Sequence, residues 1–491
     1  MSAAADEPTP FVYDEVAYPA PLTPAQTPDR MRAVGLMYGY RTVECATASV
    51  LEIGCGDGLN LVGIAALYPQ SRMVGFDLSH AAIERGRAAV VEAGLTNVDL
   101  HVGNILDYPR DGEKFDYIAC HGVYSWVPEH VRAPLLDLIA AKLAPGGIAY
   151  VSYDCLPAAA PKREINRFLV ERTRHIDHTD TRIWEAIKLL GMITGNQAEG
   201  SRLKAQLDQL AEDLPNFDLN YFFHDWLADF YDPVSVFGFS KAAAAHGLKV
   251  AGDAGLTDFV TETLGEKMQD YLKDETDQAK RADLLDYARG VQMFRRTLLI
   301  RADAPPPPAT DPINELTFEF LGEVERGEDD KGAFAKFTRG EAFLVARSAG
   351  DIGVLQALED VSPNELTAAE IIRRTGLPEA EAIASLKKTV AIGLALPRAT
   401  PQPYVVVPGE RPLAGPLVRT MMASGNWTVT LRHVKFMVEV EPTRVFLTLC
   451  DGTRTRAELA AEMSKRFDSE VGVEKIEAAI ADLGPKRVFT A

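Results

Sequence analysis

Three closely spaced glycines directly after a short apolar run constrain this chain most strongly. The run Val50–Ile53 predicts a buried strand. Gly54, Gly56 and Gly58 follow it, and a helical stretch begins just after them. Glycines are needed where the backbone takes positive φ or passes close to a bound ligand. Nucleotide-binding α/β folds build a site in this way at the carboxyl ends of their strands, so we expect a binding site directly above this turn.

Further short apolar runs alternate with helical or loop stretches along the first 150 residues, at Met73–Phe76, Asp99–Val102, Phe115–Ala119 and Ile148–Ser152. This alternation predicts an α/β fold with a doubly wound, mostly parallel, Rossmann-like sheet. Two later runs, 248–252 and 297–301, would supply the last two strands. Residues 160–240 and 255–293 would then be helical insertions, and Glu262–Gly290 reads as helix.

The ligand that this turn favours is cationic and carries no phosphate. The dinucleotide fingerprint needs a third glycine where this chain has Leu59. Glu52 and Asp57 would also repel a pyrophosphate. Acidic groups beside a glycine turn suit S-adenosylmethionine, which has an ammonium, a sulfonium and a ribose diol.

Polar side chains after the next strands fit the same ligand. Asp77 ends the second strand, where a carboxylate can accept both ribose hydroxyls. Asn104 and Ile105 follow the third strand and would contact the adenine, and His121 follows the fourth. The residues expected to bind the cofactor are Glu52, Gly54, Cys55, Gly56, Asn60, Asp77, Leu78, Asn104, Ile105 and His121.

In this order and spacing, residues 45–153 resemble the class I S-adenosylmethionine-dependent methyltransferases. The stretches 13–19, 27–30 and 121–128 are similar to bacterial members that carry a methyltransferase regulatory domain and a C-terminal winged helix. That group includes the lysine methyltransferases of rickettsial outer-membrane proteins. Further similar segments occur at 221–227, 252–255, 294–299, 431–433 and 451–453, so the resemblance extends over most of the chain.

One segment departs from the pattern of this family. The family usually has Ser-Tyr-Asn and then Pro-Gly-Trp after its fifth strand, whereas this chain has Ser152-Tyr-Asp154 and Pro157-Ala-Ala159. An aspartate replaces the amide, and a glycine and a large aromatic are lost. The departure leaves cofactor binding intact and bears on the identity of the methyl acceptor.

The resemblance implies in-line methyl transfer to a lysine ε-amine of a protein. With a pKa of about 10.4, only on the order of one lysine in a thousand is neutral at pH 7, so a base or desolvation must help. His121 is the preferred base or hydrogen-bond partner, and Asp154 the second candidate. Tyr124, Trp126 and Tyr153 could line an aromatic slot that holds the ammonium by cation–π attraction.

Each of these residues also has a structural interpretation. His121 could cap a strand end, Tyr124 and Trp126 could pack as core or lid, and Asp154 could anchor a loop. His224 and Asp225 could close over the pocket or pack a helix, and Arg295 and Arg296 are expected to bind acids on the protein's own surface. His175 and His178 have no evident third ligand, so no metal is expected.

The chain is expected to divide into five parts. They are an N-terminal cap over the active site at 1–45, a cofactor-binding core at 46–158, a helical middle region at 159–303, a proline-rich linker at 304–312 and a C-terminal α+β winged-helix-like region at 313–491. Within the last part, 366–390 reads as helix, turn, helix. Its second helix is a poor recognition face, and the net charge of −19 argues against a nucleic-acid partner.

Composition bears on compartment and partners. No apolar run approaches the roughly 20 residues that span a bilayer, and no signal peptide is evident. Five scattered cysteines fit a reducing cytoplasm. We expect a protein substrate, no membrane partner and room for a homodimer. Two rival functions remain: a small-molecule N- or O-methyltransferase, and a non-catalytic S-adenosylmethionine-responsive regulator that acts through its winged helix.

Overall fold

A seven-stranded sheet forms the centre of the computed structural model, which describes residues 12–19, 22–198, 200–201, 203–259, 264–305, 312–330, 332–339, 342–400 and 403–490. The strand order is β3-β2-β1-β4-β5-β7-β6. The strands are β1 Ser49–Ile53, β2 Arg72–Asp77, β3 Val98–Val102, β4 Phe115–Cys120, β5 Leu143–Asp154, β6 Leu248–Asp253 and β7 Phe294–Arg301. Strands β1 to β5 are parallel, whereas β7 runs antiparallel to β5 and β6. The predicted mostly parallel sheet is therefore confirmed, including its two late strands.

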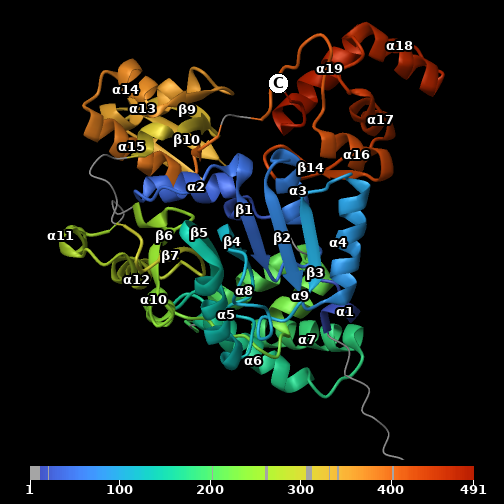
Figure 1. The fold of residues 1–491 in the computed structure, drawn as a ribbon. Helices are drawn as coiled ribbons and strands as arrows, with labels where there is room; N and C mark the ends of the chain where they lie inside the picture. The colour runs from blue at the N-terminus through green and yellow to red at the C-terminus, as the bar shows by residue number, and fades with distance from the viewer. Residues whose placement is uncertain are drawn as a thin grey trace, which may run out of the picture.

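Helices cover both faces of this sheet (Figure 1). One face packs against α2 Pro28–Met37, α3 Leu59–Leu67 and α4 His80–Glu92. The other packs against α5 Glu129–Lys142, α10 Val236–Ala244 and α12 Gln278–Arg289. Because both faces are covered, the central strands are apolar along their whole length, which is why they read as continuous apolar runs.

The middle region forms a separate helical layer at the carboxyl ends of the strands. It contains α6 Ala160–Thr173, α7 Thr179–Thr194, α8 Lys204–Asp213 and α9 Leu219–Trp226, which share one apolar cluster with Val16. The short helix α1 Val12–Glu15 lies at the same end (Figure 1). The stretch expected as helix at 262–290 is divided into α11 Glu266–Asp274 and α12, because Asp277 caps a new helix with its carboxylate.

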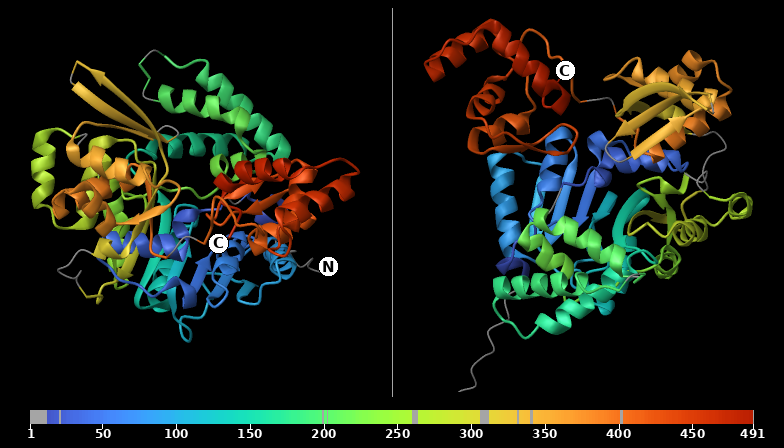
Figure 2. Two further views of the ribbon diagram at one scale, coloured as in Figure 1. Left: turned by 90° about the horizontal axis from the view of Figure 1, so that it is seen from above. Right: turned by 180° about the vertical axis from the view of Figure 1, so that it is seen from behind.

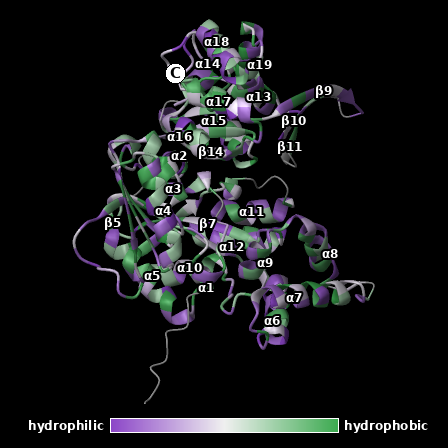
Figure 3. Cartoon of the chain, turned by 90° about the vertical axis from the view of Figure 1, so that its right-hand side faces the viewer, coloured by the Kyte–Doolittle hydropathy of each residue, from purple (hydrophilic) through white to green (hydrophobic). Residues whose placement is uncertain are grey.

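The C-terminal part divides into an intermediate unit (312–400) and a winged-helix unit (403–490). The apolar residues of the intermediate unit continue the cluster on the α2 face of the sheet, whereas the winged-helix unit has a cluster of its own. The intermediate unit contains β8 Thr317–Phe320, β9 Glu323–Asp329, β10 Gly332–Arg339, β11 Ala342–Ala346, α13 Ala349–Glu359, β12 Glu365–Thr367, α14 Ala368–Thr375, α15 Glu379–Ala391 and β13 Ala395–Arg398. The helix-turn-helix expected over 366–390 forms as α14 and α15. The β9–β10 hairpin of the intermediate unit projects from the molecule (Figure 2, left) and is mainly hydrophilic (Figure 3).

The winged-helix unit contains α16 Pro416–Ser424, β14 Trp427–Val429, β15 Lys435–Met437, α17 Glu441–Leu449, α18 Arg456–Phe467 and α19 Val473–Leu483. Figure 1 shows β14 beside α3 of the catalytic core. Most of the linker expected at 304–312 lies outside the described residues. Among the residues that the structure describes, no helix has the length and apolar character needed to cross a membrane.

Candidate functional site

The glycine turn after β1 adopts the backbone that the sequence predicts. Gly54, Gly56 and Gly58 have φ of 69°, 56° and 67°, a region that side chains rarely adopt. A Cβ on Gly54 would lie 2.7 Å from Val123 Cγ2, whereas a Cβ on Gly56 would have no atom within 4 Å. The turn is thus packed below Gly54 and open at Gly56, which leaves a place for a ligand against the backbone.

Asp77 ends β2 beside this turn. Its Oδ2 accepts the Gly56 N–H at 2.8 Å, and its Oδ1 accepts the Ser79 N–H at 2.8 Å. Burial raises the pKa of the carboxyl, and these backbone donors oppose the shift. Leu78 beside it is 46% exposed. Because a carboxylate oxygen can accept more than one hydrogen bond, Asp77 can also receive hydroxyl donors from a ligand.

Glu52, just before the glycine turn, is buried with one satisfied and one unsatisfied oxygen. Oε1 accepts from Asn60 Nδ2 at 2.9 Å and from Gln26 Nε2 at 3.3 Å, while Oε2 has no partner. Burial raises the pKa of Glu52 to about 8, although the Asn60 hydrogen bond lowers it. Buried polar atoms are nearly always paired, so the unpaired oxygen beside the turn is a place for a cationic or N–H donor group of a ligand.

Two of the expected cofactor residues turn their side chains away from the turn. Asn60 is buried, and its Oδ1 accepts the Thr23 N–H at 3.2 Å and lies 2.7 Å from His433 Nε2. Cys55 is buried in the core beneath Gly75. Cys55 therefore presents its backbone, and not its buried side chain, to the turn, while the Asn60 amide contacts Glu52.

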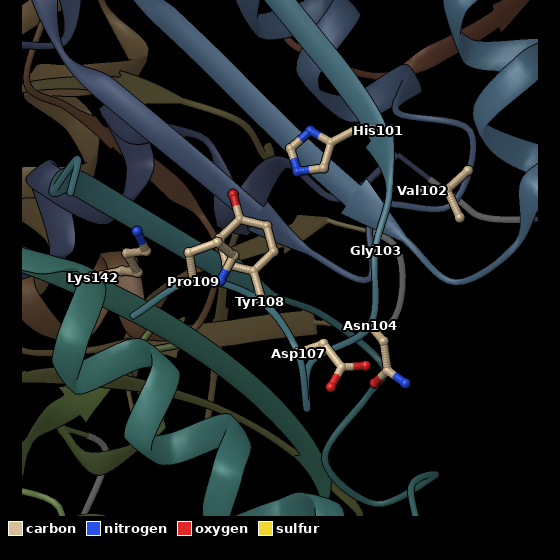
Figure 4. Close-up of a pocket in the computed structure, with 8 residues that line it drawn as sticks. All are labelled: His101, Val102, Gly103, Asn104, Asp107, Tyr108, Pro109 and Lys142. Carbon is tan, nitrogen blue, oxygen red and sulfur yellow. The ribbon is translucent and has the colours of Figure 1, made fainter. Parts of the chain in front are cut away.

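Asn104 and Ile105 follow β3 at the edge of the sheet. Asn104 Oδ1 accepts the Leu106 N–H at 3.0 Å, so its amide keeps N–H donors for a ligand. A pocket of about 450 Å³ adjoins Asn104 (Figure 4). Its other side is formed largely by β3 and the loop after it, including the stacked rings of His101 and Tyr108. Among the expected cofactor residues, only Asn104 lines this pocket, which lies beyond the glycine turn.

His121 follows β4 and contacts Tyr150 of the neighbouring strand β5. Its Nδ1 lies 2.9 Å from Tyr150 Oη, and its ring meets the Phe294 ring edge-on at 5.6 Å. Burial, and then the charge of Arg296, lower the pKa of His121 to about 4. The imidazole is therefore neutral at pH 7, so it can accept a hydrogen bond but is only a weak base.

The aromatic slot expected from Tyr124, Trp126 and Tyr153 does not form. Tyr153 is fully buried, and its Oη lies 2.8 Å from Thr297 Oγ1. Tyr124 is also buried and packs edge-on against Phe239. Consecutive strand residues point to opposite faces, so Tyr153 and its neighbour Asp154 cannot both face one site. Tyr124 and Tyr153 are core residues.

Trp126 instead belongs to a cluster around the buried ammonium of Lys162, which we call the lysine cage. The side chains around Lys162 Nζ are Asp154, Asp225, Trp126, Trp226 and Tyr231. The ammonium lies 3.1 Å from Asp154 Oδ2 and 2.8 Å from Asp225 Oδ2. The three ring centroids lie 4.9 to 5.4 Å away. Burial lowers the pKa of Lys162, but the two carboxylates outweigh it and raise the pKa above its usual value.

Asp154 is tied into this cage and is not an available base. Its Oδ2 accepts from Lys162 Nζ and from Tyr231 Oη, the latter at 2.5 Å. Its backbone N–H donates to Ser125 Oγ at 3.0 Å. The carboxylate therefore anchors the loop after β5.

The N-terminal segment connects the lysine cage to the cofactor side. Burial raises the pKa of Tyr13 to about 12, and the charges of Asp77 and then Asp225 add to the shift. The neighbouring Asp14 accepts from Ser79 Oγ at 2.6 Å, two residues after Asp77. The Tyr13 ring stacks on His224 at 4.2 Å, and His224 Nε2 lies 2.8 Å from Val16 O. His224 thus holds the N-terminal segment in place.

Two further expectations concern charged and metal-binding residues. Arg295 binds acids, but these are buried and not on the surface: Asp253 at 3.5 Å, Asp258 at 2.9 Å and Asp286 at 2.6 Å. Arg296 contributes its charge near His121. No group of three or more metal-ligating side chains occurs within the described parts of the chain.

The sheet order, the open glycine turn and the acids Glu52 and Asp77 fit a cationic ligand with a ribose diol. The unpaired Glu52 oxygen in particular suits the positive end of such a ligand. The fold and the site define a class I S-adenosylmethionine-dependent methyltransferase.

Comparison with known proteins gives the family. Residues 50–147 match a methyltransferase domain, 218–301 a "predicted methyltransferase regulatory domain", and 410–482 a "PKMT, C-terminal winged helix domain". The uncharacterized protein RP028 of Rickettsia prowazekii is 34% identical over 219 residues, which cover 44% of this chain and 87% of RP028. The chain therefore belongs to the family of methyltransferases that carry this regulatory domain and a PKMT-type winged helix, as its sequence predicts.

Two more comparisons show the extent of the likeness. RP789 of the same organism is 29% identical over 296 residues, which cover 59% of this chain and 53% of RP789, so the chain spans about half of that relative. The structure of PKMT2 from Rickettsia typhi in complex with AdoHcy aligns with a TM-score of 0.78 at 22% identity, covering 96% of this chain and all of PKMT2. That likeness is one of fold and extends from the N-terminal segment into the winged-helix unit.

Proposed function

We propose that this methyltransferase transfers methyl groups to lysine side chains of a protein. Glu52, the backbone of Gly54 to Gly56, and Asp77 would hold S-adenosylmethionine, with Leu78, Asn104 and Ile105 at its adenine end. When bound, the cofactor supplies an electrophilic methyl group on a sulfonium. The chain's own residues exclude water and align the acceptor for in-line attack.

The lysine cage is the observation that carries the proposal. Two carboxylates face one ammonium there, so the cluster has a net charge of −1 when all three groups are ionised. Aromatic rings and carboxylates are the groups that attract alkylammonium ions. The N-terminal segment contacts both the cofactor side and the cage: Asp14 Oδ1 accepts from Ser79 Oγ, two residues after Asp77, and Tyr13 stacks on His224, the residue before Asp225 of the cage. Lys162 occupies this buried cage, so the cage shows that this end of the sheet holds an alkylammonium between carboxylates and rings, the chemistry that an acceptor lysine also requires.

His121 would act as a hydrogen-bond acceptor near the reacting amine. Its pKa of about 4 keeps the imidazole neutral above pH 5, so it would not store the proton of a lysine. Loss of that proton would then depend on desolvation of the amine, and the rate would rise with pH toward the pKa of the acceptor. The names of the winged-helix model and of PKMT2 agree with a protein acceptor.

The compartment and assembly belong to the same proposal. All five cysteines are buried free thiols, which supports a reducing cytoplasm. A homodimer and the absence of a nucleic-acid partner stay predictions from the sequence.

The test uses methyl-labelled S-adenosylmethionine, the purified protein and a fractionated cell lysate. We expect label in a protein band, and mass spectrometry should find it on lysine. The matched control is Asp77→Asn, which should strongly reduce the signal at a cofactor concentration near the Kd of the natural protein. Label found only in small molecules would contradict the proposal and indicate a small-molecule N- or O-methyltransferase. Tight cofactor binding without label anywhere would favour the regulator.

A further inference from the structure

The turn between β14 and β15, residues 430–434, inserts a histidine of the winged-helix unit against the catalytic core. His433 is buried, and its Nε2 lies 2.7 Å from Asn60 Oδ1 in the first turn of α3. Asn60 in turn donates to Glu52 Oε1 at 2.9 Å. A continuous buried chain therefore leads from the winged-helix unit to the acid beside the glycine turn.

Gly63 makes room for this contact. It lies in the interior of α3, where glycine is unfavourable compared with alanine. A Cβ on Gly63 would come within 2.8 Å of His433 Cε1 and Nδ1. The imidazole thus occupies the space of the missing side chain, and the helix gives up a better helix former to receive it.

The backbone of His433 is also unusual. Its φ of 60° is left-handed, which non-glycine residues adopt only at a cost. The His433 N–H donates to Thr430 O at 2.8 Å, and the Thr430 N–H donates to Val434 O at 2.9 Å, which closes a tight turn. The turn therefore holds the imidazole in a fixed direction.

The hydrogen bonds from His433 through Asn60 to Glu52 fix which imidazole nitrogen carries a proton. Asn60 uses its amide nitrogen to donate to Glu52, so its oxygen accepts and His433 Nε2 must carry the proton. His433 Nδ1 is buried without a partner. Burial lowers the pKa of His433 to about 4, which agrees with a neutral ring of one tautomer.

We propose that His433 is a positioning residue of the cofactor site: through Asn60 it fixes Glu52 so that the second carboxylate oxygen of Glu52 is left for the cofactor. This β14–β15 turn of the winged-helix unit then completes the cofactor site of the catalytic core. The inference depends on the methyltransferase class of the chain and not on the nature of the acceptor.

The experiment measures binding of S-adenosylhomocysteine to the full chain by calorimetry. His433→Ala should weaken binding by about tenfold, as expected for a buried polar network that loses one member. His433→Gln keeps an N–H donor at the position of Nε2 and should restore most of the affinity. Val429→Ala is the matched control, because Val429 packs on Gly63 in the same interface and its apolar side chain cannot hydrogen-bond to Asn60. It should leave the affinity within about twofold.

Gly63→Ala gives a second test that leaves His433 in place. The substitution favours an exposed helix, yet here it should displace the imidazole and weaken binding as His433→Ala does. Both variants should raise the KM for S-adenosylmethionine more than they change kcat. Unchanged affinity in a folded His433→Ala or Gly63→Ala protein would overturn the proposal. Equal losses in His433→Ala and Val429→Ala would reduce His433 to a packing residue.

Discussion

At the scale of single residues, the two acids of the cofactor site are prepared in different ways. Asp77 is already bound by two backbone N–H groups and only adds ligand contacts to them. Glu52 keeps one oxygen unsatisfied in a buried place. Ligand binding should therefore change the protonation and environment of Glu52 more than those of Asp77.

Asp77→Asn tests the first of these acids. The amide keeps one acceptor for Gly56 or Ser79 but loses the charge and the second acceptor, so the ribose contact should weaken. We expect an affinity for S-adenosylhomocysteine lower by at least about tenfold, or about 1.4 kcal/mol, in a titration. The control Asp99→Asn removes an exposed carboxylate on β3 and should bind normally. Normal binding by Asp77→Asn would remove Asp77 from the cofactor site.

Glu52→Gln tests the second acid through pH. The Glu52 carboxyl titrates near 4.5 in the unfolded chain and near 8 in the fold. Between about pH 4.5 and 8 the Glu52 carboxyl ionises in the unfolded chain but stays protonated in the fold. The ligand-free protein therefore loses stability as pH rises through this range. Glu52→Gln has no group that titrates there. The difference in free energy of unfolding between the variant and the natural protein should therefore shift in favour of the variant by up to about 4 kcal/mol over that range. Urea unfolding at pH 4.5, 6 and 8 measures the difference, and a constant difference would contradict the pKa shift.

The sequence predicts local backbone structure correctly. The left-handed glycine turn and the ends of the strands follow from short segments of chain, whereas the roles of the site residues stay predictions. Tyr153 differs from its expected place because alternating strand residues face opposite sides of β5, which separates Tyr153 from Asp154. His433 was seen only as part of a family-like segment, because its partner Asn60 lies 373 residues away and no local pattern joins the two.

At the scale of elements, α6 carries a lysine that is buried and not exposed. A lysine in a charged helix normally faces solvent, yet the side chain of Lys162 is only 8% exposed. It pairs with both Asp154 at the end of β5 and Asp225 on α9. One side chain of α6 therefore fixes the middle region onto the carboxyl edge of the sheet.

Lys162→Met should destabilise the protein strongly. It leaves two like charges buried without their cation, which costs roughly 3–5 kcal/mol. The free energy of unfolding in urea at pH 7 measures the loss. Adding Asp154→Asn and Asp225→Asn to the variant should recover most of it, because the buried charges are then gone. The exposed Lys188 on α7 gives the control Lys188→Met, and equal stability of the two lysine variants would rule out a buried ion-pair role.

At the scale of the whole molecule, the turn between β14 and β15 connects the winged-helix unit to both the intermediate unit and the catalytic core. Arg432 pairs with Glu319, a fully buried carboxylate on β8 of the intermediate unit, while His433 beside it reaches α3. Arg487 Nη2 at 2.8 Å and Tyr404 Oη at 2.6 Å also donate to Glu319. The intermediate unit itself docks on α2, where Asp29 accepts the Ala399 N–H at 3.1 Å. Docking of the winged-helix unit therefore depends on Glu319 and on the cofactor side together.

Glu319→Gln should loosen this docking at a distance from the cofactor. The amide cannot neutralise Arg432 and Arg487, so buried positive charge loses its counter-ion. If the winged-helix unit positions Glu52 through His433, hydrogen exchange should become faster in the amides of α3, and affinity for S-adenosylhomocysteine should fall. The loss should not add to that of His433→Ala, because both substitutions interrupt one route. The exposed residue Glu323 on β9 provides the control Glu323→Gln. Full additivity would mean that the Glu319 and His433 contacts act separately. The winged-helix unit would then position the cofactor site without help from the intermediate unit.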